Sequence, residues 1–241
     1  MSPSYSGGVA PADREAPVGR VAAGAVASPA PNRVAPTGAI LAIDQRGTFL
    51  GNRGSIHREP GLIARPWQVR RWITCRLEYK GWVAPKWEPG RWTPLFFWDE
   101  AVALAAGHRP CALCRRPDFD RWCDAWAAAF GTRERVDPMD RHLHTDRVEP
   151  TWRRGSEGQG WQRRHGRAWG EVPVGAFVEV DGGSALVLDD RVVPWSAAGY
   201  GPAGDRPTRG TATVLTPACT VEVLRHGFEP ALHPAVTGGG G

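Results

Sequence analysis

Long apolar segments are missing from this sequence. Nowhere do about eighteen apolar residues follow one another, which excludes a helix of the length that a bilayer requires. No secretory leader is recognisable either, because Arg14, Glu15 and Arg20 interrupt the apolar residues near the beginning of the chain. Without export the five cysteines stay reduced, which favours metal binding or burial over disulfide pairing. These absences predict a cytoplasmic protein that makes no contact with a membrane.

Lysine is scarce, and arginine supplies nearly all of the positive charge in a chain whose formal net charge is +5. The planar guanidinium group suits phosphate and carboxylate better than the point charge of lysine does. A modest excess of this kind permits binding to nucleic acid without demanding it. It is equally typical of a soluble protein from an arginine-rich proteome, so charge alone leaves the partner open.

Apolar periodicity is also missing at the N-terminus, where residues 1–36 are rich in Ala, Pro, Gly and Ser. Such a segment cannot bury enough surface to offset its ordering entropy, and it is predicted to be a disordered tail. Strand and helix patterns alternate over residues 37–150, residues 151–170 form an Arg, Trp and Gly-rich linker, and residues 171–237 are rich in strand patterns. The predicted fold class is α+β, with a strand-and-helix first part and a smaller β-rich second part.

Three helices and two other elements can be placed in the first part from local signals. Helices are predicted over residues 98–106, 117–130 and about 139–148, because caps or prolines precede them and glycines end the first two. A β-hairpin is predicted over residues 37–57, and a half-buried strand over residues 72–79.

Tryptophan is abundant instead, with twelve residues of which six lie between Trp67 and Trp98. Large side chains of this kind favour a small core that needs bulky residues. A platform on which nucleic-acid bases stack is the alternative. No spacing of these aromatic residues matches a known base-stacking module, so the core interpretation is preferred.

The turn Gly107-His-Arg-Pro-Cys-Ala-Leu-Cys114 carries the clearest chemical signal in the chain. Two thiolates separated by two residues can both reach one metal ion, at a sulfur-to-zinc distance of about 2.3 Å. A short alanine-rich helix comes directly before the turn, and aromatic strand patterns come before that helix. Cys111 and Cys114 are therefore predicted to form half of a metal site.

With its aromatic strand, alanine-rich helix and Arg-Pro-Cys-x-x-Cys turn, the segment of roughly residues 70–117 resembles the zinc-binding module of the Ada DNA-repair protein. The resemblance implies a zinc ion with Cys75 as the third ligand. His57 is the preferred fourth ligand, and His108 ranks below it because its position is usually an aromatic packing residue in such modules. The chain is also similar to bacterial proteins of unknown activity that share the Gly-His-Arg-Pro-Cys turn.

The resemblance does not extend to the repair chemistry. An alkyl acceptor in an Ada-type module requires a second upstream thiol, but Arg71 and Tyr79 stand four residues away from Cys75. A zinc-dependent deaminase is a competing hypothesis, since His57-Arg-Glu59 and Pro110-Cys-x-x-Cys match the residue types and spacing of the deaminase sequence motif. Pro60 follows Glu59 directly, however, and it is incompatible with the helix that this signature needs.

A different enzyme hypothesis rests on the predicted third helix, where Asp140, His142 and His144 lie close in sequence. Asp140 and His144 are one helical turn apart, so the carboxylate can orient that imidazole for acid–base chemistry on a phosphodiester. The charged residues are also those of an ordinary solvated helix face. These three side chains are the catalytic candidates if the protein is an enzyme, a question that the sequence leaves open.

Binding to nucleic acid is the leading functional hypothesis, in DNA processing or repair, with zinc as the cofactor. Arginines are interleaved with tryptophans in the predicted linker, a composition suited to neutralising phosphates and stacking on bases. The candidate contacts are Arg53 in a Gly-Asn loop and, in the linker, Arg153, Arg154, Arg163, Arg164 and Arg167. A structural or protein-interaction module is the remaining alternative, and the oligomeric state is not predicted.

Overall fold

The computed structural model describes residues 28–84, 87–153 and 160–237, and it contains both helices and sheets, as the predicted α+β class requires. The five α-helices in these ranges are α1 (Glu100–Ala105), α2 (Arg116–Phe130), α3 (Val136–Arg147), α4 (Ala218–Arg225) and α5 (Pro234–Thr237). None of these helices combines the length and the apolar content that a bilayer crossing requires. The three predicted helices of the first part thus correspond to α1, α2 and α3.

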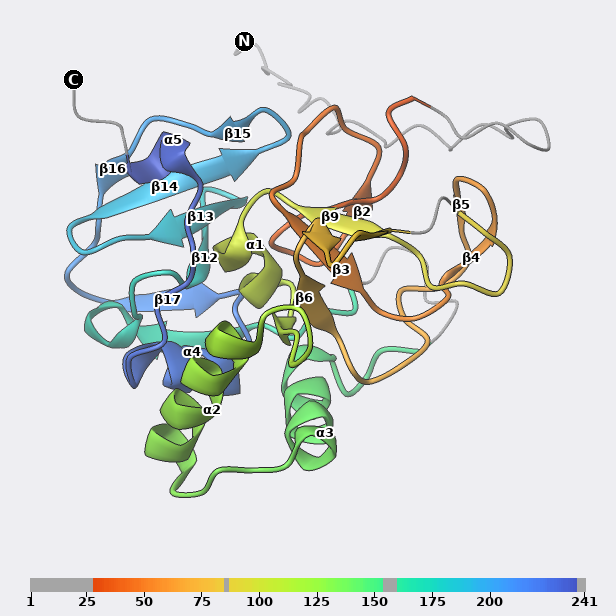
Figure 1. Ribbon diagram of the computed structural model, residues 1–241. Helices are drawn as coiled ribbons and strands as arrows, with labels where there is room; N and C mark the ends of the chain where they lie inside the picture. The colour runs from red at the N-terminus through yellow and green to blue at the C-terminus, as the bar shows by residue number, and fades with distance from the viewer. Residues whose placement is uncertain (1–27, 85–86, 154–159, 238–241) are drawn as a thin grey trace, which may run out of the picture.

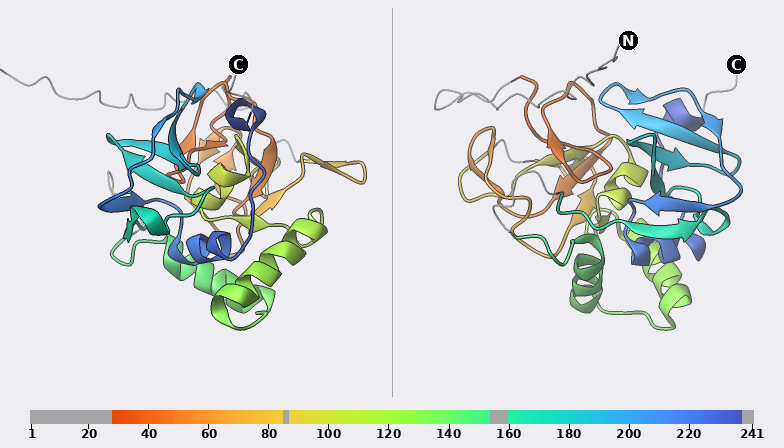
Figure 2. Two further views of the ribbon diagram at one scale, coloured as in Figure 1. Left: turned by 90° about the vertical axis from the view of Figure 1, so that its left-hand side faces the viewer. Right: turned by 180° about the vertical axis from the view of Figure 1, so that it is seen from behind.

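A mixed six-stranded sheet organises the first part of the chain. Its strands in spatial order are β10 (Arg109–Pro110), β6 (Ile73–Cys75), β3 (Phe49–Asn52), β9 (Leu95–Phe97), β1 (Arg33–Val34) and β2 (Ile40–Leu41). The pairs β10–β6 and β1–β9 are parallel, and the others are antiparallel. Two hairpins stand apart from this sheet, β4 (His57–Glu59) with β5 (Leu62–Ile63) and β7 (Glu78–Tyr79) with β8 (Trp82–Val83). The β7–β8 hairpin extends away from the other elements in the left view of Figure 2.

An antiparallel sheet of seven strands forms the second part. Its path runs β11 (His165–Ala168), β17 (Thr211–Val214), β12 (Phe177–Val180), β13 (Gly183–Val187), β14 (Arg191–Ser196) and β15 (Gly199–Tyr200), with β16 (Gly204–Asp205) paired to β14. A 3₁₀ turn, Trp169–Glu171, leads from β11 towards β12. The strands of this sheet lie within residues 165–214, so the sheet draws on part of the predicted linker as well as on the region predicted to be rich in strands.

Helix α1 lies between the two sheets, as Figure 1 and the right view of Figure 2 show. All six of its residues are buried, which is the expected position for a helix that is apolar on every side. Its small alanines allow both sheets to approach it closely. Asp99 caps the helix by accepting a hydrogen bond from the backbone of Val102 at 2.9 Å, and Gly107 ends it with a φ of 81°.

The apolar core joins the two parts of the chain. One cluster combines Phe97 and Ala101 from the first part with Phe177 and Leu186 from the second. The other cluster packs α2 and α3 against α4 and the antiparallel sheet. In Figure 1 these three helices lie together below the sheets. Because each part completes the core of the other, they are not independent folding units.

Several sequence predictions differ from the structure at their boundaries. Residues 28–36 of the predicted disordered tail belong to the fold, since β1 pairs with both β2 and β9, while residues 1–27 lie outside the described ranges. The predicted linker of residues 151–170 includes β11, which pairs with β17 over four residues. Both segments are held in place by backbone hydrogen bonds to strands that are distant in the sequence. Composition alone does not reveal such partners.

The predicted hairpin over residues 37–57 is wrong, because β2 pairs with β1 whereas β3 pairs with β6 and β9. In the predicted strand over residues 72–79, alternation of apolar residues favours Ile73, Cys75, Leu77 and Tyr79 as the buried face, but the structure reverses the two faces around Cys75. Trp72 and Thr74 are fully buried, while Ile73 and Cys75 are only partly buried. On the buried face, the Trp72 ring contacts those of Trp67, His108 and Trp161, so position in the sheet overrides the apolar alternation.

Candidate metal centre and adjoining clefts

Three cysteines from two segments meet at the edge of the first sheet. Parallel pairing of β10 with β6 sets Arg109 opposite Ile73 and Pro110 opposite Thr74, so the next residues in both strands, Cys111 and Cys75, become neighbours. The Cys111 amide donates to the Thr74 carbonyl at 2.9 Å and continues this register. The sulfurs of Cys75, Cys111 and Cys114 all lie within 4.8 Å of one another.

Backbone amides surround the sulfurs of this thiol cluster. The Leu113 amide donates to the Cys111 sulfur at 3.4 Å, and the amides of Cys114 and Arg76 donate to the sulfurs of Cys111 and Cys114. Amides pointed at sulfur favour the thiolate form. The Cys-x-x-Cys turn ends directly at α2, with the Arg115 amide bonded to the Cys111 carbonyl at 3.1 Å, so the helix fixes the position of both thiols.

Mutual hydrogen bonding divides the protons unequally among the three thiols. The pKa of Cys111 is lowered by its hydrogen bond with Cys114 and, to a smaller extent, by its hydrogen bond with Cys75. The hydrogen bonds with Cys111 raise the pKa of both Cys75 and Cys114. Cys111 is therefore the thiol of the cluster that loses its proton most readily. A divalent cation replaces the remaining protons when it binds thiols, and three sulfurs around one zinc ion are roughly 3.8 Å apart in a tetrahedral site. The cluster thus has the donor type and the spacing that can hold a metal ion.

His57 does not join the thiol cluster, contrary to its assignment as the fourth ligand. It begins strand β4 of a separate hairpin, where its Nδ1 lies 2.6 Å from the Thr93 hydroxyl and its ring contacts Trp87 edge-on. Glu59 lies on the same strand, so His57 and Glu59 are not on a helix as the deaminase hypothesis requires. The geometry at β4 therefore argues against that hypothesis.

His108 lies in the interior and does not join the thiol cluster. Its ring centroid is 4.6 Å from that of Phe97 and 5.3 Å from that of Trp72. Burial, followed by the charges of Arg53 and Arg147, holds the pKa of His108 well below its usual range. The neutral imidazole is thus part of the core and accepts a hydrogen bond from the Nε of Arg53 at 3.3 Å.

Arg53 is fully buried, so its predicted role as a nucleic-acid contact is wrong. The residue lies in the loop directly after the central strand β3, but its side chain points into the interior. Its guanidinium lies 4.4 Å from the Trp72 ring centroid and donates to the Gly38 carbonyl at 3.1 Å. Desolvation by burial lowers the pKa of Arg53 to about 9. Arg147 contacts the same indole at 3.8 Å and donates to the Gly107 carbonyl at 2.7 Å.

The arginines of the predicted linker divide into paired and unpaired groups. Arg164 forms an ion pair with Glu179 at 2.9 Å, and Arg167 forms one with Glu222 at 2.5 Å. The exposed Arg153 donates to the backbone carbonyls of Pro150 and Trp152, and Arg163 is exposed. Arg154 lies outside the described residues. The paired carboxylates weaken the case for this segment as a phosphate-binding arm.

The three catalytic candidates on α3 do not form one site. Asp140 is buried and receives two hydrogen bonds from Arg109, each 2.8 Å long, so its carboxylate does not orient His144. His144 Nδ1 instead lies 3.0 Å from Nη2 of Arg147. His142 is exposed and its ring contacts Trp126 and Phe130. Asp140 therefore has a structural role as the counterion of Arg109.

The tryptophan-rich segment is divided between the core and a partly exposed cluster. Trp72 is fully buried, in agreement with the core interpretation, whereas Trp82 of the β7–β8 hairpin is 46 % exposed and stacks on Trp92. Trp67 contacts Trp72, Trp152 and Trp161, and its ring also meets His144 edge-on.

Acid is expected to destabilise the protein through His144. Burial, followed by the charge of Arg147, lowers the pKa of His144 from 6.5 to about 4. The unfolded chain therefore binds more protons than the folded one between these values, so stability falls as the pH falls from about 6.5 to about 4. Urea unfolding of His144→Gln at pH 7.5 and pH 5 should show a smaller loss than in the wild type.

His142→Gln is the matched control, since it removes an exposed histidine from the same helix that contacts neither Trp67 nor Trp72, the two tryptophans beside His144. A His144→Gln variant that retains the whole pH dependence would contradict this assignment. Part of the dependence should persist in any case, because the buried and neutral His108 acts with the same sign.

One cleft borders the thiol cluster at Cys111, and a second cleft adjoins the first. The first, called here the thiol cleft, has a volume of 670 Å³ and is lined by Arg71, Ile73, Arg109, Cys111, Ala112, Leu113, Arg135, Val136, Asp137 and Pro138. The second, called here the arginine cleft, has a volume of 710 Å³ and is lined by Asn52, Gly54, Ser55, Gln68, Val69, Arg70, Arg71, Ile73, Gly90, Trp92, Asp137, Asp140 and Arg141. Arg71, Ile73 and Asp137 line both, so the two clefts are continuous.

Sequence reasoning missed these cleft arginines. Arg70 and Arg71 precede β6, while Arg135 and Arg141 belong to the start and the middle of α3. Within the described ranges Arg70, Arg135 and Arg141 form no ion pair, whereas Arg71 lies 3.5 Å from Asp137. The Arg70-Arg71 pair next to the strand of Cys75 was the only local signal, and the contribution of α3 depends on the packing.

Comparison of the chain with family models, with curated proteins and with solved structures found no match.

Proposed function

We propose that the protein is a zinc protein that binds nucleic acid, with zinc held by Cys75, Cys111 and Cys114 and phosphates bound in the continuous clefts beside it. The observation that carries the proposal is the convergence of unpaired arginines from two segments on a surface that begins at the thiols. Zinc is the metal that the donor set favours, since thiolate ligands in a reduced protein select soft or borderline ions.

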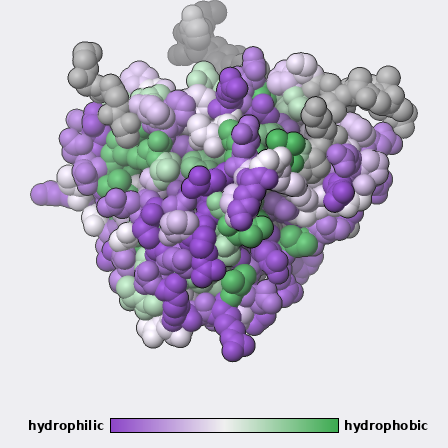
Figure 3. Space-filling view, in the orientation of Figure 1, coloured by the Kyte–Doolittle hydropathy of each residue, from purple (hydrophilic) through white to green (hydrophobic). Residues whose placement is uncertain are grey.

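The charges of the clefts support a polyanionic ligand. Asp140 is neutralised by Arg109, which leaves Asp137 as the exposed carboxylate against Arg70, Arg71, Arg135 and Arg141. The resulting local excess is positive, and guanidinium groups bind phosphate oxygens in pairs of hydrogen bonds. The surface seen in Figure 3 is mainly hydrophilic, with apolar residues in small separate patches, which also favours a charged partner.

An aromatic ring lies within reach of the same surface. Trp92 lines the arginine cleft and is stacked on Trp82, with a centroid distance of 5.6 Å. Single-stranded nucleic acid is commonly bound by arginines along its backbone and by aromatic rings under its bases. The combination favours single-stranded segments over a plain duplex as the ligand.

Binding to a single-stranded oligonucleotide is expected to depend steeply on salt. Replacing Arg70 and Arg141 with alanine should weaken the affinity and reduce the slope of log K against log salt by about 2, because two phosphate contacts are lost. Fluorescence anisotropy with a labelled oligonucleotide at several salt concentrations measures both quantities.

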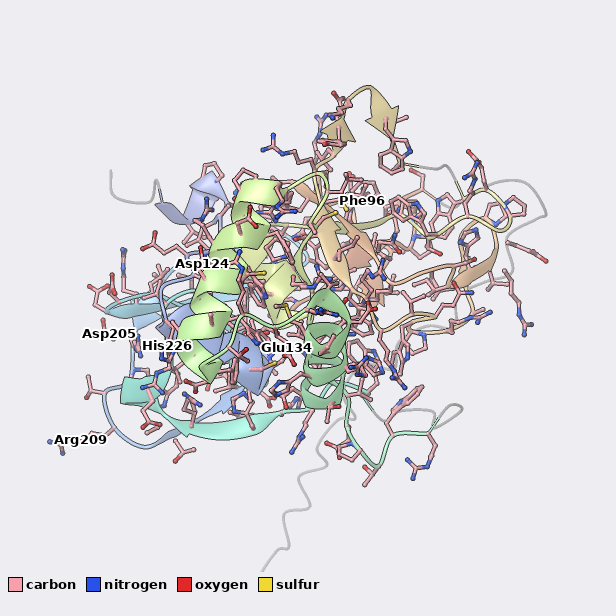
Figure 4. All side chains as sticks on the ribbon, turned by 60° about the horizontal axis from the view of Figure 1, so that its bottom comes forward. Phe96, Asp124, Glu134, Asp205, Arg209 and His226 are labelled. Carbon is pink, nitrogen blue, oxygen red and sulfur yellow. The ribbon has the colours of Figure 1, made fainter. Side chains whose placement is uncertain are left out.

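Arg209→Ala/Arg225→Ala is the matched control, because it removes the same charge from exposed positions that line neither cleft. Arg209 lies at an edge of the molecule distant from α3 in Figure 4. If the slope of log K against log salt were the same for both double variants, binding would depend only on the net charge of the protein. An affinity that does not change with salt would refute phosphate binding.

A further inference from the structure

The thiol cluster supplies three ligands, and zinc in proteins takes four. Within the described ranges no other Cys, His, Asp or Glu joins the cluster. All seven histidines and all five cysteines of the chain lie in these ranges, so no further thiol or imidazole exists outside them. Only Asp13, Glu15 and Glu157 have donor side chains of this kind outside them.

The cluster is also accessible from one side. Cys75 and Cys114 are only partly buried, and Cys111 forms part of the wall of the thiol cleft. The neighbouring turn residue Leu113 is 71 % exposed, so it does not close the cleft over the sulfurs. Closed four-ligand sites are typical of structural zinc, whereas three protein ligands beside a cleft are typical of zinc that binds a ligand from solution.

We propose that the fourth coordination position of the metal is exchangeable and takes a small thiolate ligand from solution that enters through the thiol cleft. This inference rests on the metal site of the proposed function. A thiol is the chemical class that fits best, because the existing donors are sulfur and a soft donor completes the set most favourably. The incoming thiol binds as its thiolate and releases its proton to the solvent.

The cleft further selects a thiol that carries a second negative charge. Arg71, Arg135 and Asp137 line it. Arg71 lies 3.5 Å from Asp137, whereas Arg135 forms no ion pair within the described part of the chain, so Arg135 is the cation left for an anionic ligand. Zinc with three thiolates has a net charge of −1, so nearby cations favour the addition of a further anionic ligand. Apolar contacts come from Ile73, Leu113 and Val136, which suit a short carbon chain.

The test uses the full chain with cobalt(II) in place of zinc, since cobalt reports its ligands by absorption. Mercaptoacetate should change the visible spectrum saturably, and 2-mercaptoethanol should do so at higher concentration. Arg71→Ala/Arg135→Ala should weaken mercaptoacetate binding at least several-fold while its effect on 2-mercaptoethanol is small. Arg209→Ala/Arg225→Ala should leave both affinities unchanged.

The outcomes separate this inference from the function on which it rests. If one cobalt ion binds per chain and neither thiol changes its absorption spectrum, the fourth ligand belongs to the chain. That result would refute the exchangeable coordination position. A response to both thiols with equal affinity, unchanged by Arg71→Ala/Arg135→Ala, would refute the selection of an anionic thiol. If no cobalt binds to the reduced protein, the metal site itself fails, and with it the proposed function.

Discussion

Replacing Cys111 and Cys114 together with serine is expected to abolish metal binding and to lower the melting temperature. In the proposed zinc site the two thiols are two of the four ligands that zinc takes, and both lie within 4.8 Å of Cys75. At a free zinc concentration 1,000-fold above the dissociation constant, the ion contributes about 4 kcal/mol to folding. For a chain of this size the loss corresponds to a decrease of roughly 8–16 °C.

Metal analysis of protein purified without a histidine tag checks the first part of this prediction, and thermal unfolding with and without a chelator checks the second. Cys123→Ser is the matched control. Cys123 is a buried cysteine on α2 that is not in the cluster, so its variant loses packing but should retain one zinc per chain. If the wild-type protein contained no metal, or if a chelator did not change its unfolding, the metal site would be refuted. The three thiols would then serve only as packing residues.

Asp140→Asn is expected to destabilise the protein by about 3–5 kcal/mol, the usual result of breaking a buried ion pair by removing one charge. Both side chains of the pair are buried, and both hydrogen bonds between Arg109 and Asp140 are 2.8 Å long. The pair joins α3 to the strand that leads to Cys111, so it connects the thiol turn to the helix that lines both clefts. Urea unfolding measures the change.

Two further variants make the cause clear. Asp137→Asn, at a side chain that is 74 % exposed and one helical turn away, should change stability by less than about 0.5 kcal/mol. Arg109→Met/Asp140→Leu should recover most of the loss, since apolar residues of similar volume can replace a buried pair. Equal destabilisation by Asp137→Asn and Asp140→Asn would show that the buried pair is not responsible.

These results would also distinguish a structural role of Asp140 from the catalytic role considered for Asp140, His142 and His144. The spacing of Asp140 and His144 does allow contact on a helix, but a competing partner decided the outcome. Arg109 lies on another strand and offers two donors to the carboxylate, which a neutral imidazole does not match. A contact made across the fold thus displaced one predicted within the helix.

Local signals in the sequence determined the helices and the thiol turn. Capping by Asp99, the positive φ of Gly107 and Gly131, and the Cys-x-x-Cys spacing act over a few residues, so their effects can be read without knowing the fold. The choice of Cys75 relied on the resemblance to Ada-type modules, and the structure does bring it to Cys111 and Cys114.

Only the tertiary structure decided where the charged side chains lie. Arg53 follows a glycine-rich stretch that reads as an exposed loop, yet its strand is central in the sheet and the guanidinium is enclosed by tryptophan. His57 is separated from the thiols because its hairpin pairs with itself. The clefts require Arg70 and Arg71 from the strand side and Arg135 and Arg141 from α3. Register, layer packing and the competition of buried charges for partners set these positions, and all three depend on residues far apart in the chain.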